Sequence, residues 1–489
     1  MKPLQTLAYI LGVFLLLSGA MLLTPKDGLK IGGFTFHMPT FNEILVNDKV
    51  EYADLSDIIN QQFEIDSLVE FEVDTLMGDT LVEVIHRANY DTLVQRIQKL
   101  EMNRLGRENL EKFFYHLQHD SLTRIMHYGD SQIEGDRITA FVRNKLQVRF
   151  GGTGVGLRPA LQPYDYVFSA KQFNSENWTR YPIYGAVDST ISHSRYGVMG
   201  AFSRYAPLVP DSVPFKDSSL YEAEMTVSKT DISYRKTREY DYLRLFYGNT
   251  RRPVQTVVIA RGDTVLSDSL QANTDYAVLE CALPDSTESV TLKFSGYDGP
   301  DVYGIELASR TGVIMDNIAL RGSSGTIFSK ADYAHSLKMY KDLHPSLFIL
   351  QFGGNVVPYI QNSKAIKRYG RYFGSQIKRI KELCPEAAIL VIGPSDMSTK
   401  EKDKYVTYDH LPELVATLRE VTVSSGCAYW DMYKAMGGYN SMPSWVNADP
   451  ELARPDYVHF SAKGARLIAN MFYNSLMFEY NTYLEEARR

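Results

Sequence analysis

The sequence predicts an α/β protein whose parallel sheet is covered by helices and interrupted by an inserted β-sandwich, with an N-terminal membrane anchor. Three patterns predict this class. Strand-like apolar runs alternate with helical segments before residue 165 and again after residue 310. Short alternating segments separated by turn signals fill the stretch between them, and an uncharged apolar run opens the chain. Strands that alternate with helices indicate a parallel sheet buried on both faces, so the middle stretch interrupts one domain.

Length and composition limit the partners. The chain has 489 residues and a formal net charge of −6, which suits about two to three domains. It contains no long basic run, so we expect no nucleic acid as a partner. Cys281, Cys384 and Cys427 lie far apart and form no Cys-x-x-Cys or Cys/His cluster. We therefore expect no metal and no other cofactor.

The N-terminal apolar run spans Leu7 to Leu23. It is long for the core of a signal peptide and short for a transmembrane helix. Ser18-Gly19-Ala20 offers a cleavage site, but Met21-Leu22-Leu23 continues the run beyond it. This continuation favours an uncleaved anchor over residues 1–24, with a cleaved signal peptide as the alternative. Either way, the rest of the chain lies outside the cytoplasm.

Residues 25–115 are predicted to be a membrane-proximal, partly helical region. From Asp91 to Leu117, apolar side chains recur at intervals of three and four residues. This spacing places them on one face of a helix. We expect that helix to pack onto the α/β domain just before its first strand.

The α/β domain is predicted to consist of residues 116–165 together with 310–489. Its first strand is Leu122 to Met126, and a helix follows from Ile138 to Phe150. The glycine-rich segment Gly151 to Gly156 comes next. No strand precedes these glycines and no Gly-Lys-Ser/Thr follows them, so we interpret the segment as a loop and not as a nucleotide site.

The insertion is predicted over residues 166–309 as a β-sandwich, because short strands at regular spacing are typical of that architecture. The expected strands include Leu243–Tyr247, Gln255–Ala260, Tyr276–Leu283 and Ser289–Phe294. After the insertion, Val313 to Leu320 leads into the turn Arg321 to Gly325. The strands expected beyond it are Ser346–Gln351, Ala388–Ile392 and Ala428–Asp431, and the helices are Ala331–Leu343, Ser363–Leu383, Leu411–Ser424 and Ser461–Glu479.

Chemically useful side chains follow the ends of these strands. Gly129-Asp130-Ser131 comes after the first strand, Gly353-Gly354-Asn355 follows a later one, and Asp456 to His459 precede the last helix. Open α/β sheets place ligands at the carboxyl ends of their strands. The sequence therefore predicts that these segments meet.

Ser131 is the candidate nucleophile, since a serine hydroxyl becomes reactive when a base removes its proton. His459 is the candidate base, and Asp456, three residues earlier, is placed to orient its imidazole. The candidate oxyanion-hole donors are the backbone N–H groups of Ser131 and Gly325 and the side-chain amide of Asn355. Each such donor is typically worth ~3 kcal/mol in kcat.

Each of these residues also has a structural explanation when taken alone. Asp or Ser before a helix is a capping signal, for example. Their conjunction, in chain order and at strand ends, favours an acyl-transfer site. The charged side chains that follow Ser131 are interpreted as helix-start charges that interact with the helix dipole; they are Glu134, Asp136 and Arg137.

These segments resemble the SGNH (GDSL-type) hydrolase superfamily, which implies a three-layer, flavodoxin-like sheet. Gly129-Asp130-Ser131 matches the first block, Gly325 the second, Gly353-Gly354-Asn355 the third and Asp456-x-x-His459 the last. Two positions depart from the pattern. Gln132 replaces the usual leucine, and Val356 follows Asn355 where many members have aspartate. Gly322 is the alternative to Gly325 in the second block.

A closer likeness is to peptidoglycan O-acetylesterases and periplasmic O-acetyltransferases. It is carried by Gly129 to Asp136 and by Leu146 to Gly152. Some of these enzymes hold a carbohydrate-binding-module-like β-sandwich between the first and second blocks, where residues 166–309 stand in this chain. The likeness implies a serine esterase that removes O-acetyl groups from a cell-wall or extracellular, peptidoglycan-like glycan through an acetyl-serine.

Two alternatives stay open. If a sugar hydroxyl replaces water, the same site is an O-acetyltransferase, which needs an acetyl donor from a membrane-bound acyltransferase partner. A non-catalytic glycan-binding protein is the other alternative. The intact set of Ser131, Asn355, Asp456 and His459 argues against it. The resemblance implies a bacterial inner-membrane protein with a periplasmic catalytic domain, or a protein secreted to the periplasm if residues 1–24 are cleaved.

Overall fold

The computed structural model describes residues 3–23, 29–31, 34–36, 50–58, 97–209, 213–217 and 219–488. The chain forms two compact units, Met1–Glu51 and Tyr52–Arg489. Most of the predicted region 25–115 lies outside the described residues. The domain limits expected from the sequence are not tested and stay predictions.

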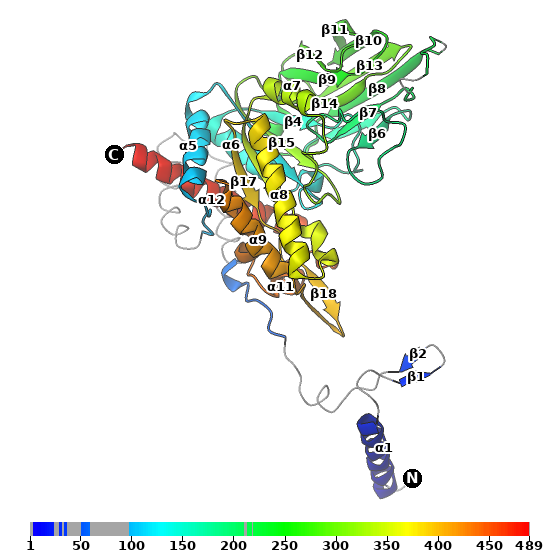
Figure 1. Ribbon diagram of the computed structural model, residues 1–489, viewed down its shortest axis with the longest axis vertical. Helices are drawn as coiled ribbons and strands as arrows, with labels where there is room; N and C mark the ends of the chain where they lie inside the picture. Colours follow the sequence, from blue (N-terminus) through cyan, green and yellow to red (C-terminus); the bar gives the residue numbers. More distant parts are fainter. Residues whose placement is uncertain are drawn as a thin grey trace. The chain divides into compact units, whose positions relative to one another are not determined.

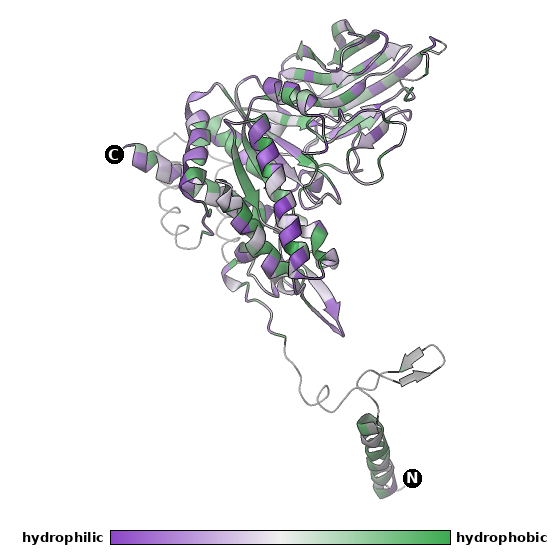
Figure 2. Cartoon of the chain, viewed as in Figure 1, coloured by the Kyte–Doolittle hydropathy of each residue, from purple (hydrophilic) through white to green (hydrophobic). Residues whose placement is uncertain are grey.

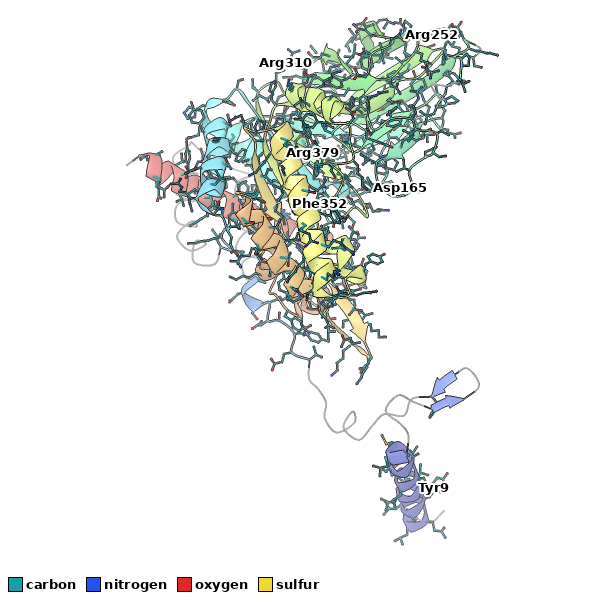
Figure 3. The ribbon with its side chains drawn as sticks, viewed as in Figure 1. Tyr9, Asp165, Arg252, Arg310, Phe352 and Arg379 are labelled. Carbon is teal, nitrogen blue, oxygen red and sulfur yellow. The ribbon has the colours of Figure 1, made fainter. Side chains whose placement is uncertain are left out.

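The smaller unit contains the helix α1 (Pro3–Leu23) and a hairpin of β1 (Leu29–Ile31) and β2 (Phe34–Phe36). Helix α1 carries no charged residue. Figure 2 shows it as hydrophobic along its length, and Tyr9 lies on it in Figure 3. It is long and apolar enough to cross a membrane, and a signal sequence fits the same description. The predicted apolar segment is therefore a helix.

The larger unit contains a parallel sheet, which has five strands in the part of the chain that the structure describes. Its order is β15-β3-β16-β17-β20, and all neighbouring strands run parallel. The strands are β3 (Leu122–Gly129), β15 (Gly312–Ala319), β16 (Pro345–Gln351), β17 (Ala388–Ile392) and β20 (Ala428–Trp430). The first strand in the chain thus lies between the second and the third, as in flavodoxin-like sheets. The predicted fold class is confirmed.

Successive side chains of a strand point to opposite faces of the sheet. Both faces of this sheet are apolar, and helices cover both. In β16, Phe348 and Leu350 join one hydrophobic core, whereas Leu347 and Ile349 join the other. The first core is closed by α7 (Tyr333–Leu343), α8 (Ser363–Leu383) and α9 (Leu411–Ser424), and the second by α5 (Arg104–His119), α6 (Thr139–Phe150) and α12 (Ala462–Ala487). Figure 1 shows α8 and α9 side by side.

Side-chain caps fix where several helices begin, as expected for Asn and Ser at N-caps. Asn103 accepts the Gly106 N–H at 2.9 Å and starts α5. The helix predicted from Asp91 is therefore too long, because residues 97–103 are not helical. Glu101 instead pairs with Tyr429 through two backbone hydrogen bonds of 2.8 Å and extends the sheet edge.

The inserted part is built from two antiparallel sheets. Within the described residues one has the order β11-β10-β13-β8-β5 and the other β12-β9-β14-β7-β6, with β4 also paired to β14. The strands are β4 (Gly154–Arg158), β5 (Lys171–Asn174), β6 (Thr179–Pro182), β7 (Ala201–Arg204), β8 (Tyr221–Ser228), β9 (Tyr242–Gly248), β10 (Val254–Ala260), β11 (Asp263–Leu270), β12 (Ala277–Ala282), β13 (Ser289–Gly296) and β14 (Asp301–Ala308). Figure 1 shows most of them in green, gathered at one end of the larger unit. Strand β14 escaped prediction because it is buried throughout and does not alternate.

The glycine-rich segment is a loop only in its first part, because β4 begins at Gly154. The glycines are needed for close backbone contact. A Cβ on Gly152 would lie 2.4 Å from the Val313 nitrogen, and one on Gly154 would lie 2.4 Å from the Leu307 oxygen. Both residues have φ of +95°, which favours glycine. These contacts join the end of α6 to β15 and β14.

We expect Gly152→Ala to lower the free energy of unfolding by about 2–4 kcal/mol, from left-handed backbone strain plus the steric clash. Gly185→Ala is the matched control, since Gly185 has φ of +76° but nothing within 4 Å of an added Cβ. It should lose only the backbone contribution, ~1–2 kcal/mol. Denaturant unfolding of both variants measures the difference, and equal losses would contradict the close-contact explanation.

Candidate active site

Ser131 lies on the turn that follows β3, the strand flanked by β15 and β16. At this point the order of the strands reverses, and open α/β sheets bind ligands outside the strand ends there. The short helix η1 (Glu134–Asp136) follows Ser131. Tyr128 and Met126, on β3, are buried in the core beneath the turn. The fold therefore presents the Ser131 hydroxyl at the carboxyl ends of the parallel strands, where the sequence predicts a site.

A chain of hydrogen bonds joins the three residues predicted to act together. Ser131 Oγ lies 2.8 Å from His459 Nε2, and His459 Nδ1 lies 2.9 Å from Asp456 Oδ2. The Asp456 and His459 side chains are partly exposed, at 47% and 29%. The arrangement thus has the geometry of a nucleophile, a base and an orienting carboxylate, open to solvent on one side.

Asp456 also shapes the loop that carries His459. Its Oδ1 accepts the backbone N–H groups of Val458 and His459, each at 2.9 Å. Partial burial alone would raise the pKa of Asp456, but these hydrogen bonds and the one to the imidazole lower it below its ordinary value. The carboxylate is therefore ionised at neutral pH, and it fixes both the loop and the ring.

The three predicted oxyanion donors differ in their present partners. The Ser131 N–H makes no hydrogen bond to any described residue. The Asn355 amide donates to Asp130 Oδ2 and to the Ser323 carbonyl, both at 3.1 Å. The Gly325 N–H donates to Ser323 Oγ at 3.2 Å. Ser131 thus offers a free donor, whereas an oxyanion at Asn355 or Gly325 has to compete with these contacts.

Val356 follows Asn355 where many members of the family have an aspartate. In this chain Asp130 supports Asn355 instead. The Asp130 side chain is buried, and burial raises the pKa of its carboxyl to about 6 even though hydrogen bonds from the Gln132 N–H and Asn355 oppose that rise. A carboxylate accepting the Asn355 amide orients that side chain toward the nucleophile turn.

Gly325 and Gly322 differ in their surroundings. Both have positive φ, +75° and +77°. A Cβ on Gly325 would lie 2.7 Å from the ring of Phe352, which is labelled in Figure 3, while one on Gly322 meets nothing within 4 Å. Only Gly325 packs tightly against the residue that follows β16.

The charges behind Ser131 have partners that the helix-dipole interpretation does not include. Asp136 is 4% exposed and pairs with Arg143. Arg137 donates to the Ser131 carbonyl at 2.6 Å and to the Phe460 carbonyl at 3.3 Å, so it joins the nucleophile turn to the loop after His459. Glu134 pairs with Arg321. Their partners lie far along the chain or are buried, and local charge patterns do not reveal them.

Gln132, which stands where the family pattern has leucine, joins the nucleophile turn to two other segments through side-chain hydrogen bonds. Its Nε2 donates to the Val458 carbonyl at 2.7 Å and to Ser395 Oγ at 3.3 Å. Val458 directly precedes His459, so Gln132 positions the base relative to Ser131. The departure from the family pattern therefore has a structural purpose in this chain.

We expect Gln132→Leu to lower kcat about tenfold to a hundredfold with little change in KM, because small displacements of reacting groups are costly. Gln255→Leu is the control, since it removes a side-chain hydrogen bond to Ser267 in the sandwich. Steady-state kinetics on an aryl acetate separates kcat from KM. A Gln132→Leu enzyme with wild-type kcat would rule out the positioning role.

Comparisons with known proteins concern the family and the fold. Residues 285–467 match the GDSL-like lipase/acylhydrolase family, a range that contains Gly325, Asn355, Asp456 and His459 but begins after Ser131. No curated protein matches the chain. The resemblance to SGNH hydrolases is confirmed, and the chain carries an ester hydrolase domain of this type.

One solved structure shares the fold. A peptidoglycan O-acetylesterase is 23% identical, with a TM-score of 0.57 over 76% of this chain and 96% of that one. An acetylxylan esterase from Geobacillus stearothermophilus is 18% identical, with a TM-score of 0.27 over 35% of this chain and 74% of that one. The first likeness covers both the parallel sheet and the insertion, and the second is too low to carry an argument.

Proposed function

We propose that this chain, which carries an SGNH-type ester hydrolase domain, removes O-acetyl groups from a cell-wall or extracellular glycan of the peptidoglycan kind. The observation that carries the proposal is the hydrogen-bonded chain from Ser131 through His459 to Asp456, at 2.8 and 2.9 Å. Such a chain activates a serine toward an ester carbonyl. The polar surroundings of Ser131 suit a sugar ester better than a long acyl chain.

In the first step, Ser131 Oγ attacks the acetyl carbonyl carbon and its proton passes to His459 Nε2. Asp456 stabilises the imidazolium through Nδ1. The carbonyl oxygen becomes an oxyanion near the Ser131 N–H. His459 then returns the proton to the departing sugar oxygen as the ester bond breaks, which leaves an acetyl group on Ser131.

In the second step, His459 removes a proton from water, and the resulting hydroxide equivalent attacks the acetyl-serine carbonyl. The bond to Ser131 Oγ breaks, acetate leaves, and the serine regains its proton from His459. No cofactor enters either step. If a glycan hydroxyl takes the place of water, the same steps transfer the acetyl group, which is the O-acetyltransferase alternative.

The role of the Asn355 side-chain amide as an oxyanion donor can be tested directly. We expect Asn355→Ala to lower kcat about 10²–10³-fold, the usual effect of losing one such donor, because the amide lies beside Asp130 at the nucleophile turn. Asn355→Asp should lose at least as much, since it removes the donor and adds a like charge beside Asp130. Wild-type kcat in both variants would exclude Asn355 from the oxyanion hole.

The substrate class rests on two supports. The shared fold with a peptidoglycan O-acetylesterase spans most of the chain, and the two-sheet insertion lies between the first and second sequence blocks, where related enzymes hold a carbohydrate-binding-module-like sandwich. We propose an O-acetylated glycan as the partner.

The apolar helix α1 would hold the domain at the inner membrane, facing the periplasm.

The test is acetate release by the purified full-length chain in detergent. Substrates are an aryl acetate, O-acetylated peptidoglycan and acetylated xylan, each assayed beside Ser131→Ala. Release from peptidoglycan by the wild type alone supports the proposal. Release from the aryl acetate and xylan but not from peptidoglycan would move the substrate to another glycan. Acetyl transfer to an added glycan without net hydrolysis would favour the transferase, and binding without turnover the glycan-binding alternative.

A further inference from the structure

A cavity separate from Ser131 and its partners lies beside the nucleophile turn. It is lined by Gly135 and Asp136 of that turn, Arg158 on β4, Arg180 on β6 and Asn317 on β15. Its volume is about 40 Å³, room for about three water molecules at ~10–15 Å³ each. The cavity therefore lies where the nucleophile turn, the parallel sheet and the sandwich meet.

Arg158 is buried at this cavity and forms no ion pair with any described residue. The residue is 5% exposed. Its one hydrogen bond to a described residue is long, 3.4 Å from Nη2 to the Ala170 carbonyl, and its Nε has no partner. Burial lowers the pKa of Arg158 to about 10, with only partial relief from Asp136. An uncompensated buried charge is strongly unfavourable, so a small anion beside Arg158 would stabilise this environment.

Asp136 cannot be that anion, because its oxygens are already engaged. It accepts Arg143 at 2.7 and 3.2 Å, Asn317 at 2.9 Å and the Ser169 hydroxyl. Arg143 completes its own bonds on the Met315 carbonyl at 2.6 Å. The lining charges are thus one negative, from Asp136, against three positive from Arg143, Arg158 and Arg180, a net charge of +2.

Arg180 strengthens the positive side. Its Nε is buried without a hydrogen bond to any described residue, although the residue as a whole is partly exposed. Two guanidinium groups with unused donors therefore line one small cavity from β4 and β6. Planar guanidinium groups suit carboxylates and other small anions.

We propose that this cavity binds one small anion, of the size of acetate or chloride, between Arg158 and Arg180. The anion neutralises the buried guanidinium and joins β4 and β6 to the turn that holds Ser131. Asn317 Oδ1 accepts no hydrogen bond from a described residue, and it takes one from a water molecule that accompanies the anion. Acetate is also the product of the proposed reaction, whereas chloride comes from the surroundings.

The test compares melting temperatures of the full-length chain in detergent, in a zwitterionic buffer at constant ionic strength. Sodium gluconate, whose anion is too large for the cavity, is replaced stepwise by acetate or by chloride. We expect a saturable rise of about 2 °C or more for the anion that binds, as for any ligand selective for the folded state. The anion with the lower half-saturation concentration identifies the source.

Arg158→Met should abolish the rise and, in gluconate, melt at or above the wild-type temperature, because it removes the uncompensated charge. Arg180→Met should shift half-saturation to at least tenfold higher concentration. Arg371→Met, on the exposed face of α8, is the control and should keep the full rise, as should Ser131→Ala. An equal rise in Arg158→Met and the wild type, or no rise in the wild type, overturns the proposal. If Arg158→Met does not fold, an unchanged titration in Arg180→Met overturns it.

Discussion

Ser131→Ala is expected to lower kcat for ester hydrolysis by about 10⁴–10⁶-fold, the range found when a triad serine is removed. The change deletes one oxygen that lies 2.8 Å from His459 Nε2. Without that oxygen no acetyl-serine can form, and only substrate binding and the oxyanion donors remain. The melting temperature should stay within about 2 °C of the wild type, since the single side-chain hydrogen bond that is lost contributes only ~1 kcal/mol.

The other members of the triad make this prediction sharper. His459→Gln should reduce kcat to a similar extent, and the double variant with Ser131→Ala should fall no further, because residues that act as a unit are not additive. His410→Gln is the matched control, since His410 makes no side-chain cap at the start of α9. Activity above about one-hundredth of wild type in Ser131→Ala would place the nucleophile elsewhere.

The sequence predicts most of the α/β part because its signals are local. Helices α8 and α9 begin and end at the predicted residues, and β17 matches its predicted range. The site can be predicted as well, because the carboxyl ends of all strands lie at the same end of a parallel sheet. Ser131, Asp456 and His459 are thus found adjacent although 325 or more residues separate Ser131 from the other two.

The contacts of the site that the sequence did not predict join residues that are distant in the chain. The bond from Gln132 to the Val458 carbonyl spans 326 residues, and the one from Arg137 to the Phe460 carbonyl spans 323. No local pattern encodes such a contact. Buried charges were missed for a related reason, because Asp136 beside Ser131 looks like a helix-start charge until Arg143 is seen to face it.

A buried charge cluster joins the parallel sheet to the sandwich and carries the largest expected effect on stability. Arg124 on β3 donates to both oxygens of Asp316 on β15, at 2.9 and 2.8 Å, and also pairs with Glu306 on β14. Arg124 and Glu306 are 1% exposed and Asp316 is fully buried. Arg244 pairs with Glu306 from the other side, and the Leu157 N–H donates to Asp316. The cluster therefore contains two guanidinium groups and two carboxylates.

We expect Arg124→Met to lower the free energy of unfolding at pH 7 by about 3–5 kcal/mol, the usual result of breaking a buried ion pair by removing one partner. Asp316 would be left buried without the guanidinium that now donates to both of its oxygens. Denaturant unfolding in detergent measures the loss. Arg252→Met is the control, because Arg252 forms a half-exposed pair with Asp217, and such pairs contribute ~0–1 kcal/mol.

The pH dependence separates lost charge pairing from lost packing. In the wild type, burial would raise the pKa of Glu306, but Arg124 and Arg244 hold it below its ordinary value. That stability is present above the unfolded pKa, about 4.5, and is lost as the pH falls through the folded value. In Arg124→Met, Glu306 loses one of its two cations, so its folded pKa rises and its charged form destabilises the protein at neutral pH. The deficit relative to wild type should therefore shrink between pH 7 and pH 5. A deficit that is constant over this interval would mean that Arg124 stabilises the fold by packing alone.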